Sequence, residues 1–484
     1  MRNDFHVRLQ PKLTILNEEQ KEEIHLASLE ILERTGILVQ EDEAVRLLSK
    51  AGCYVKDGNR VFIPAPVLEE AIRSVPKRIA ISNRLKERVM FLEDRKSYFG
   101  TGSDTPNVLD IAGGEHRKAV LNDVRNAAQI CDSVKNIDFV MSMALADDVP
   151  ASLADRYQFE AMVSHTTKPI MFTAWNRRGL EDIYHMAIAV AGGEENLRRN
   201  PFLIHYSEPI APLVHPKDSL QKLLFCAEKH IPVEYHSISM AGATAPATLM
   251  GSFVQANARM LSGLVIHQLK QRGAPLIVQS PIICLDMRTT LMPYFGPDWC
   301  LGALLTKEMA LYYEIPTFGK AGATDAKVLD QQAGIEIGMS ILLEGLVGNN
   351  LIHDIGYLEN GLTSSLASIV ICDEVISHVR RFLRGIDLSP DHMAISLIDQ
   401  VGPQGNYLAL EHTFKFYRKE GWFSKLIDHE RRGKWLELGS KTMLQKAEET
   451  AKKIIESHEA PPLSPEVKRE LEVVLRRAQE RSQG

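Results

Sequence analysis

Two short apolar runs in the second half of the chain, Pro316-Thr317-Phe318-Gly319 and Asn350-Leu351-Ile352-His353-Asp354, are separated by a largely apolar segment of helical length. Short apolar runs that alternate with helical segments predict parallel β-strands joined by crossover helices. This unit decides the fold because it recurs along the chain towards the N-terminus.

Six further runs precede these two, about 30 to 43 residues apart, and each is followed by a helical segment: Ser97-Tyr98-Phe99-Gly100, Phe139-Val140-Met141-Ser142-Met143-Ala144, Pro169-Ile170-Met171-Phe172-Thr173, Phe202-Leu203-Ile204-His205-Tyr206, Pro232-Val233-Glu234-Tyr235-His236 and Pro275-Leu276-Ile277-Val278-Gln279. Eight such units predict an α/β fold, the (β/α)8 TIM barrel. The alternative is an open doubly wound sheet, which usually has a Gly-rich phosphate turn after its first strand. The first turn here, Gly100-Thr101-Gly102-Ser103-Asp104-Thr105, lacks the third small residue of GxGxxG, so the barrel is favoured.

The regions outside these units predict extensions on the barrel. Residues 1–90 begin with helical periodicity at Ile24 to Leu32 and continue with segments punctuated by proline, so we expect a helical N-terminal flank. The barrel is assigned to residues 91–386. Residues 387–484 are expected to form a helical C-terminal extension, with a highly charged last stretch.

Composition limits the class of protein. The 484 residues are 45% hydrophobic and 24% charged, and the formal net charge of −6 argues against nucleic acid or an anionic membrane surface as partner. No apolar run approaches the roughly 20 residues of a membrane span, and the start lacks the apolar segment of a secretory signal. Six cysteines occur without CxxC, as expected of buried thiols in a reducing compartment. We therefore expect a cytoplasmic protein.

In a barrel of this type the reactive groups lie at the carboxyl ends of the strands. A metal site is not expected there, because HxH, HExxH and cysteine clusters are missing from the sequence. Lys320 stands where a Schiff-base lysine could lie, but pairing with Asp325 or a position in water is favoured. GxSxG, the motif of a serine nucleophile, does not occur.

Aromatic residues are the more telling feature of the strand ends. They make up only 7% of the chain, yet many fall in or just after the strands: Tyr98, Phe99, Trp175, Tyr206, Tyr235, Tyr294, Phe295, Trp299, Phe318 and Tyr357. About half of them are expected to fill the barrel, whereas Trp175 and Tyr357 lie beyond the strands. A cavity lined by aromatic rings and a few carboxylates suits a quaternary ammonium ion, which each ring face attracts by roughly 0.5 to 2 kcal/mol.

Several longer motifs carry a specific resemblance. They are Met240-Ala241-Gly242-Ala243-Thr244-Ala245-Pro246, the small-residue helix from Gly251 to Lys270, Gly322-Ala323-Thr324-Asp325-Ala326-Lys327 with Asp330-Gln331-Gln332-Ala333-Gly334-Ile335-Glu336, His353-Asp354-Ile355-Gly356-Tyr357-Leu358-Glu359, and Gly405-Asn406-Tyr407-Leu408 with Glu411-His412-Thr413. With these motifs the chain resembles the trimethylamine methyltransferase (MttB) family over nearly its whole length.

The resemblance implies a barrel enzyme that moves a methyl group from a methylated amine to the Co(I) of a corrinoid, a cobalamin carried by a separate small protein. Founding members carry pyrrolysine in the loop around the DxQ segment after strand seven, whereas Asp330 to Glu336 are all standard residues here. Members without pyrrolysine resemble methyltransferases for glycine betaine and related quaternary amines. The resemblance therefore implies glycine betaine as methyl donor in anaerobic methylamine and one-carbon metabolism, no metal of the chain's own, and a homo-oligomer.

The chemistry of a quaternary amine fits a site that only positions its substrate. The leaving group is a neutral tertiary amine, so no catalytic side chain is expected. The predicted substrate-binding residues are Phe99, Asp104, Trp175, Tyr206, His236, Phe318, Gln332, His353 and Tyr357, with His353 and His236 as the first donors for a betaine carboxylate. Gly242 and Gly322, one in each of two Ala-Gly-Ala-Thr runs, are expected to let the corrinoid approach backbone N–H groups closely.

Three alternatives stay open at this point. The barrel could bind a quaternary amine without transferring its methyl group. It could act on trimethylamine or on another betaine, such as carnitine, proline betaine or γ-butyrobetaine. It could also be a Schiff-base lyase that uses Lys320.

Overall fold

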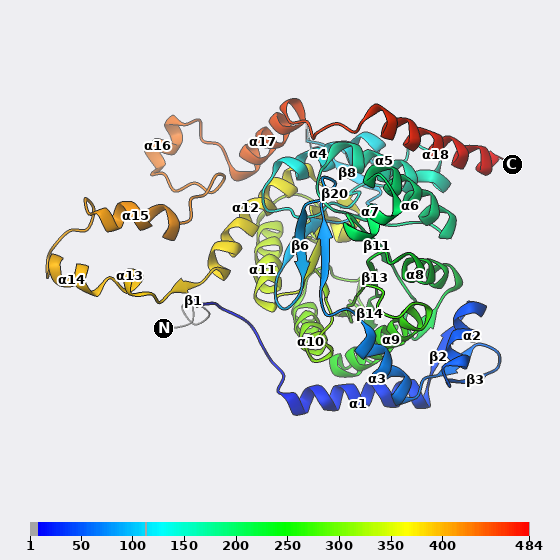
Figure 1. Cartoon of the computed structure of the whole chain (residues 1–484). Helices are drawn as coiled ribbons and strands as arrows, with labels where there is room; N and C mark the ends of the chain where they lie inside the picture. The colour runs from blue at the N-terminus through cyan, green and yellow to red at the C-terminus, as the bar shows by residue number, and fades with distance from the viewer. Residues whose placement is uncertain (1–7, 112–113, 484) are drawn as a thin grey trace.

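The computed structural model describes residues 8–111 and 114–483. A ring of parallel strands forms the centre of the molecule (Figure 1). Seven of the ring positions are the strands β7 (Tyr98–Thr101), β10 (Ile170–Phe172), β11 (Leu203–Ser207), β13 (Val233–Tyr235), β15 (Leu276–Ile277), β17 (Phe318–Lys320) and β18 (Leu351–Ile355). The eighth position, between β7 and β10, is held by Phe139 and Val140, which form isolated parallel bridges.

Strand pairing passes through all eight positions. β10, β11, β13 and β15 pair in that order, and β17, β18 and β7 form a second parallel sheet. Parallel bridges join the two sheets, from Gly100 to Phe139, from Val140 to Ile170 and from Val278 to Thr317. The predicted (β/α)8 barrel is confirmed.

A helix follows each strand position and packs outside the ring, as the βα pattern requires. These helices are α4 (Leu121–Ser133), α5 (Ala154–His165), α6 (Arg177–Ala191), α8 (Lys217–Lys229), α9 (Leu249–Lys270), α10 (Pro297–Tyr313), α11 (Gln331–Val347) and α12 (Leu366–Leu383). Short elements are inserted at the carboxyl ends of the strands: β8 (Asn107–Leu109), β9 (His116–Lys118), β12 (Val214–His215), β14 (Ser239–Ala241), β16 (Ile282–Cys284), β19 (Tyr357–Leu358) and β20 (Thr363–Ser364), and the 3-10 turns η2 (Ala151–Leu153) and η3 (Glu359–Gly361). The helix α7 (Glu194–Arg199) lies between α6 and β11, at the amino end of the barrel.

Side chains alternate between two cores because successive residues of a strand point to opposite faces. The outer core lies between strands and helices and includes Phe99, Val233 and Ile352. The inner core fills the ring with residues such as Phe139, Met171, Ile204, Ile277, Phe318 and Leu351. The hairpin of β5 (Ile79–Ser82) and β6 (Arg88–Leu92) adds Ile79, Ile81, Met90 and Leu92 to the inner core, so it plugs the end of the ring where the strands begin.

The N-terminal flank is helical only in part. It contains α1 (Glu18–Arg34), α2 (Asp42–Lys50) and α3 (Ala65–Ser74), of which α1 and α3 pack on α9. It also contains β2 (Ile37–Val39), β3 (Tyr54–Lys56) and β4 (Arg60–Phe62), which form a small sheet with β12. These strands of three residues are too short to show a period of two, so sequence periodicity does not reveal them.

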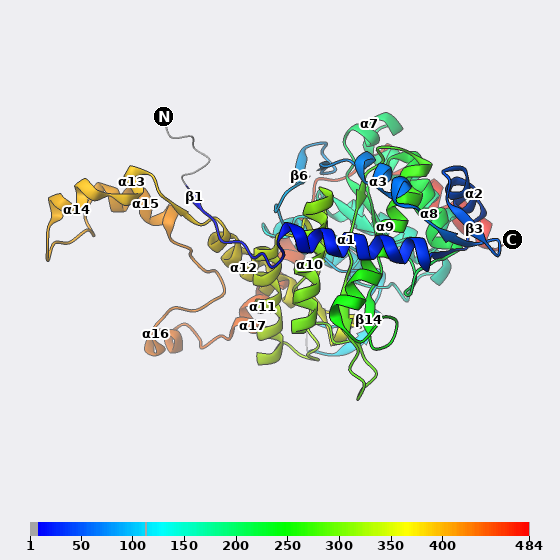
Figure 2. The ribbon, with the colours of Figure 1, turned by 90° about the horizontal axis from the view of Figure 1, so that it is seen from below.

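The C-terminal extension is helical and has two parts. Residues 388–442, with α13 (Pro390–Met393), α14 (Ile395–Val401), α15 (Glu411–Glu420) and α16 (Arg432–Glu437), form an arm that projects from the barrel in both views (Figures 1 and 2). β1 (Arg8–Leu9) pairs with β21 (Ile386–Asp387) at its base. The chain then returns, so that α17 (Met443–Ser457) packs on α12 and α4, and α18 (Pro465–Gln483) packs on α6. Within the described part of the chain, no helix is both long and apolar enough to span a membrane.

Candidate active site at the barrel mouth

Four rings meet inside the barrel near the carboxyl ends of its strands, and we call them the aromatic floor: Tyr206, His236, Phe318 and His353. The centroid of Tyr206 lies 5.6 Å from His236, 5.9 Å from Phe318 and 6.0 Å from His353. Phe318 and His353 are in closest contact, with centroids 4.3 Å apart. All four residues were predicted as substrate-binding residues, and the structure brings them together because each lies at an inward-facing position of its strand.

The floor carries little net charge at its centre. His236, the residue just after β13, and Glu234 on β13 are hydrogen-bonded through Nδ1 and Oε1 at 2.5 Å. Burial lowers the pKa of His236 and raises the pKa of Glu234 well above its usual range. Both shifts favour the uncharged forms, so we expect a neutral imidazole beside a protonated carboxyl group. Glu234 was not among the predicted site residues, since a glutamate inside an apolar strand gives no signal of which way it points.

The other floor residues already use some of their polar atoms. The Tyr206 hydroxyl donates to Glu208, and His353 Nδ1 lies 2.8 Å from the Asp354 carboxylate. The two histidines predicted to donate to a substrate carboxylate therefore each have one ring nitrogen engaged by a neighbouring acid.

Asp104 and Tyr357 lie at the side of the mouth formed by β7. The Asp104 carboxylate accepts hydrogen bonds from Ser142 Oγ at 3.1 Å, Gln158 Nε2 at 3.0 Å and Thr173 Oγ1 at 2.8 Å. Asp104 therefore ties three neighbouring βα units together. The Tyr357 hydroxyl donates to the carbonyl of Ser103, and its ring lies where a Cβ at Gly102 would fall.

Lys320 ends β17 and lies inside the protein. It is only 4% exposed, and its Nζ lies 3.9 Å from the ring centroid of Tyr294 and 4.0 Å from that of Trp299. Burial lowers the pKa of Lys320 to about 8. The sequence favoured a lysine paired with Asp325 or in water, and its burial contradicts a position in water. Asp325 instead accepts from the backbone N–H of Tyr294 at 2.8 Å.

Many buried polar atoms at the mouth lack a partner among the residues described. They come from the ends of β11, β13, β15 and β17 and from the segments after them: Ser207 Oγ, Glu234 Oε2, Ser237 Oγ, Ser239 Oγ, Gln279 Oε1, Ser280 Oγ and Lys320 Nζ. Buried polar groups are nearly always hydrogen-bonded, to protein, water or ligand. Other unpartnered polar atoms are buried elsewhere in the described residues, but a polar ligand at this end of the barrel would supply partners for these seven.

Three of the predicted residues lie away from the floor. Phe99 faces outward and packs in the outer core, where the guanidinium of Arg380 lies 5.9 Å from its ring centroid. Trp175 follows β10 and is 55% exposed. Gln332 is exposed in the first turn of α11 and donates to Glu336 at 3.0 Å. An odd or even position along a strand decides whether a ring faces the interior of the barrel, and for Phe99 that position is the outward one.

The two Ala-Gly-Ala-Thr runs have different environments. Gly242 is exposed on the loop after β14, with φ of 88°. Gly322 is buried with φ of 74°, and its N–H donates to Ser340 Oγ at 3.0 Å. The N–H groups of both glycines are therefore already bonded within the protein, that of Gly242 to the carbonyl of Ala245 at 3.1 Å, and the two runs differ in their exposure.

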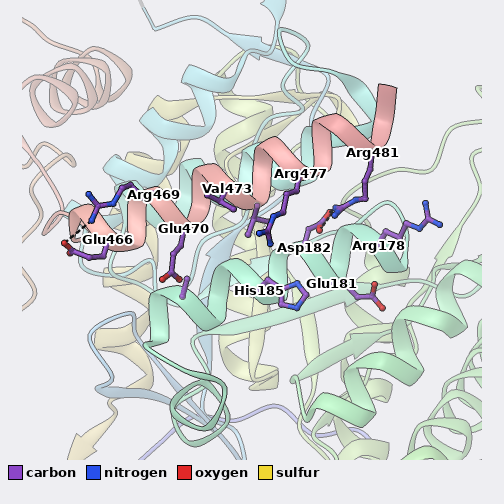
Figure 3. Close-up of a pocket in the computed structure, with 12 residues that line it drawn as sticks. Arg178, Glu181, Asp182, His185, Glu466, Arg469, Glu470, Val473, Arg477 and Arg481 are labelled. Atoms are coloured by element: carbon purple, nitrogen blue, oxygen red, sulfur yellow. Dashed lines mark hydrogen bonds and ion pairs between the residues drawn. The ribbon is translucent and has the colours of Figure 1, made fainter. Parts of the chain in front are cut away.

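A large groove lies elsewhere on the molecule. It has a volume of about 780 Å³ and runs between α6 and α18 on the outside of the barrel (Figure 3). Two ion pairs join residues that line it, Arg481 with Asp182 and Arg469 with Glu466. In residues 8–111 and 114–483, no group of three or more His, Cys, Asp or Glu side chains is placed to hold a metal ion.

A comparison with protein families decides what kind of barrel this is. The sequence model of the trimethylamine methyltransferase (MTTB) family matches residues 2–482, nearly the whole chain. The chain belongs to this family. The resemblance found in its motifs is confirmed.

Relatives within the family differ in the methyl donor that their names give. The chain is 30% identical to trimethylamine methyltransferase MttB of Desulfitobacterium hafniense strain DSM 10664 / DCB-2 over 448 residues, which cover 92% of this chain and 90% of the relative. It is 27% identical to the glycine betaine methyltransferase of D. hafniense strain Y51 over 470 residues, 97% of this chain and 98% of the relative.

A solved structure agrees with the fold. The monomethylamine methyltransferase (MtmB) of Methanosarcina barkeri superposes with a TM-score of 0.54 and covers 92% of this chain and 88% of its own, at 10% sequence identity. At that identity the likeness concerns the barrel architecture alone.

Proposed function

We propose that this protein transfers a methyl group from a quaternary amine, glycine betaine, to the Co(I) of a corrinoid carried by a partner protein. The observation that carries the proposal is the aromatic floor at the mouth of a barrel of this family. Rings packed together in a water-poor site attract a quaternary ammonium ion through their faces. The neutral Glu234–His236 pair leaves the centre of the floor without a competing cation.

The reaction needs positioning rather than acid catalysis. The acceptor supplies the electron pair of the new carbon–cobalt bond, and the carbon–nitrogen bond breaks with its pair on nitrogen, which leaves dimethylglycine as a neutral amine. The floor would hold the ammonium group with one methyl directed out of the mouth, in line for displacement. Asp330 to Glu336, where founding members carry pyrrolysine, are standard residues, which favours a quaternary over a tertiary amine.

The direct test is methyl transfer to free cob(I)alamin. With purified protein, we expect methylcobalamin to form from glycine betaine and not from trimethylamine, as followed by absorbance. The same assay with carnitine, proline betaine and γ-butyrobetaine tests whether another betaine yields methylcobalamin more readily. Methyl transfer from trimethylamine alone would contradict the proposal, and tight betaine binding without any methylcobalamin would show a binding barrel instead.

A Schiff-base lyase is a second candidate because of the lowered pKa of Lys320, which makes its amine a better nucleophile near neutral pH. Borohydride treatment in the presence of a carbonyl substrate distinguishes the two. We expect no increase in protein mass, since the ammonium is held between two rings; a covalent adduct on Lys320 would favour the lyase.

We also propose that the protein acts as a homo-oligomer built on its C-terminal arm. The arm exposes large apolar side chains, with Phe414 90% and Leu408 81% exposed. The neighbouring helix α11 exposes Ile335 and Met339, and both views show the arm pointing away from its own barrel (Figures 1 and 2). Large apolar side chains exposed together mark a surface that a partner buries. A second copy of the chain is present wherever the chain is, so we expect it to be that partner. The exposed rim of the mouth, which includes Gly242, is left for the corrinoid protein.

Light scattering tests the oligomer. We expect the wild-type protein to have a multiple of the mass of one chain, and the double change Leu408→Glu with Phe414→Glu to reduce it to one chain, because charge in an apolar interface is costly. Leu85→Glu is the matched control, since Leu85 is exposed on the loop of the β5–β6 hairpin, far along the chain from the arm. A single-chain mass for the wild-type protein at micromolar concentration would contradict the proposal.

A further inference from the structure

The ammonium group of Lys320 is buried and has no hydrogen-bond acceptor among the described residues. Its Nζ lies between the rings of Tyr294 and Trp299 and makes no hydrogen bond to any residue that the structure describes. An ammonium group carries three donors, and leaving them unpaired away from water is costly. The two rings stabilise the charge but accept none of its hydrogen bonds.

The nearby acids accept no hydrogen bond from Lys320 Nζ, although Glu344 Oε1 is itself buried without a partner among the described residues. Asp325 accepts from the N–H of Tyr294 at 2.8 and 3.0 Å, Asp354 lies 2.8 Å from His353 Nδ1, and Glu344 accepts from Asn349 at 2.8 Å. They offset the charge of Lys320 through space without accepting its protons. Within the described residues, the N–H groups of Lys320 are therefore strong donors without a hydrogen-bond partner, as is Nη1 of the buried Arg259, whereas His236 and His353 each have one ring nitrogen engaged.

The position of Lys320 relative to the floor is set by strand geometry. Lys320 and Phe318 lie two residues apart on β17, so they share the inward face, one layer apart. Lys320 is also the register partner of His353 on β18. By strand alternation and register, Lys320 therefore follows Phe318 of the aromatic floor on the same face of β17 and lies beside His353.

We propose that Lys320, held between Tyr294 and Trp299, binds the anionic group of the methyl donor, so that the substrate is a zwitterion with a carboxylate. This inference rests on the proposed methyl transfer and specifies its substrate class. The carboxylate would accept the hydrogen bonds that Lys320 does not make within the protein. Asp325 accepts from the backbone N–H of Tyr294 and so fixes this residue beside Lys320. This side of the binding site is therefore ordered before the substrate arrives, and little further ordering is needed on binding.

The test compares two cations that differ in the carboxylate. Binding of glycine betaine and of tetramethylammonium is measured by calorimetry for the wild-type protein and for Lys320→Met, which keeps the length of the side chain without its charge. We expect Lys320→Met to weaken betaine binding about tenfold or more, the effect of a hydrogen bond to a charged group, and to change tetramethylammonium binding by less than about twofold. Equal loss of both ligands, or loss of neither, would overturn the inference.

Lys327→Met is the matched control. Lys327 lies on the same loop, is exposed, and donates to the carbonyl of Asp325. This variant therefore removes the same charge without changing Lys320 or the two rings beside it. We expect it to bind both ligands as the wild-type protein does. Betaine affinity that falls equally in both lysine variants would show a general effect of charge and contradict a specific site.

The wild-type protein provides a test that needs no variant. We expect tetramethylammonium to yield methylcobalamin much less readily than glycine betaine at equal concentrations below saturation. If tetramethylammonium reacts as well as the betaine, the role of Lys320 is wrong although methyl transfer from quaternary amines stands. If no quaternary amine yields methylcobalamin but the betaine still binds better than tetramethylammonium, the proposed function fails and the role of Lys320 in binding does not.

Discussion

Replacing Asn350 by leucine is expected to lower the free energy of unfolding by about 3–5 kcal/mol, the cost of breaking a buried polar network that contains a charge. Asn350 is fully buried just before β18. Its Nδ2 lies within hydrogen-bond distance of the carbonyls of Glu93, Asp94 and Lys96 at 3.1, 3.3 and 3.0 Å. Its Oδ1 accepts from the N–H of Thr317 at 2.9 Å.

The charge in this network belongs to Lys307 of α10, whose Nζ lies 3.2 Å from Asn350 Oδ1. Leucine has a similar size but would remove one acceptor from this ammonium group, which retains the Asp94 carbonyl and Thr317 Oγ1, and would remove the amide donor from three carbonyls at the closed end of the barrel. The same network joins the turn after the β5–β6 hairpin to β17 and β18. Its loss is therefore expected to weaken the packing of the hairpin as well as that of the barrel strands.

Denaturant unfolding followed by circular dichroism measures the effect. Asn196→Leu is the control, because Asn196 is exposed on α7 and makes one local bond to the carbonyl of Gly192. We expect the control to change the free energy of unfolding by less than about 0.5 kcal/mol. A loss below about 1 kcal/mol for Asn350→Leu would contradict the importance of the network.

Replacing Tyr206 by leucine is expected to weaken the binding of glycine betaine by about 2- to 30-fold, which corresponds to one cation–ring contact of about 0.5–2 kcal/mol. Tyr206 contacts the three other rings of the aromatic floor and is itself partly exposed. Leucine keeps an apolar side chain in that place but has no ring face to attract a cation.

Tyr206→Phe separates the ring from the hydroxyl group. Phenylalanine retains the face and loses only the hydrogen bond to Glu208, so we expect affinity within about twofold of the wild type if the ring provides the attraction. Calorimetric titration of the two variants with betaine measures the difference. If Tyr206→Leu binds as tightly as Tyr206→Phe, the ammonium group does not rest on the floor.

The regular spacing of eight apolar runs was sufficient to predict the barrel, and seven of the runs contain a strand of the ring. The run from Phe139 to Ala144 is the exception, because it pairs through isolated bridges at Phe139, Val140 and Ala144 and not as a continuous strand. The small sheet of the N-terminal flank was missed because strands of three residues show no periodicity. Long-range pairing, between β12 and β2 for example, stabilises those strands, and local sequence does not record it.

The sequence alone determined the fold class, the family and the types of residue at the strand ends, because all of these follow from local patterns of apolar and polar residues. The tertiary structure decided which of those residues face one another. Tyr206, His236, Phe318 and His353 meet because closure of the ring brings inward positions of β11, β17 and β18, and the residue just after β13, to one place. Tyr294 and Trp299 flank Lys320 because the segment after β16 folds back over the mouth, a contact between residues distant in sequence that no local pattern specifies.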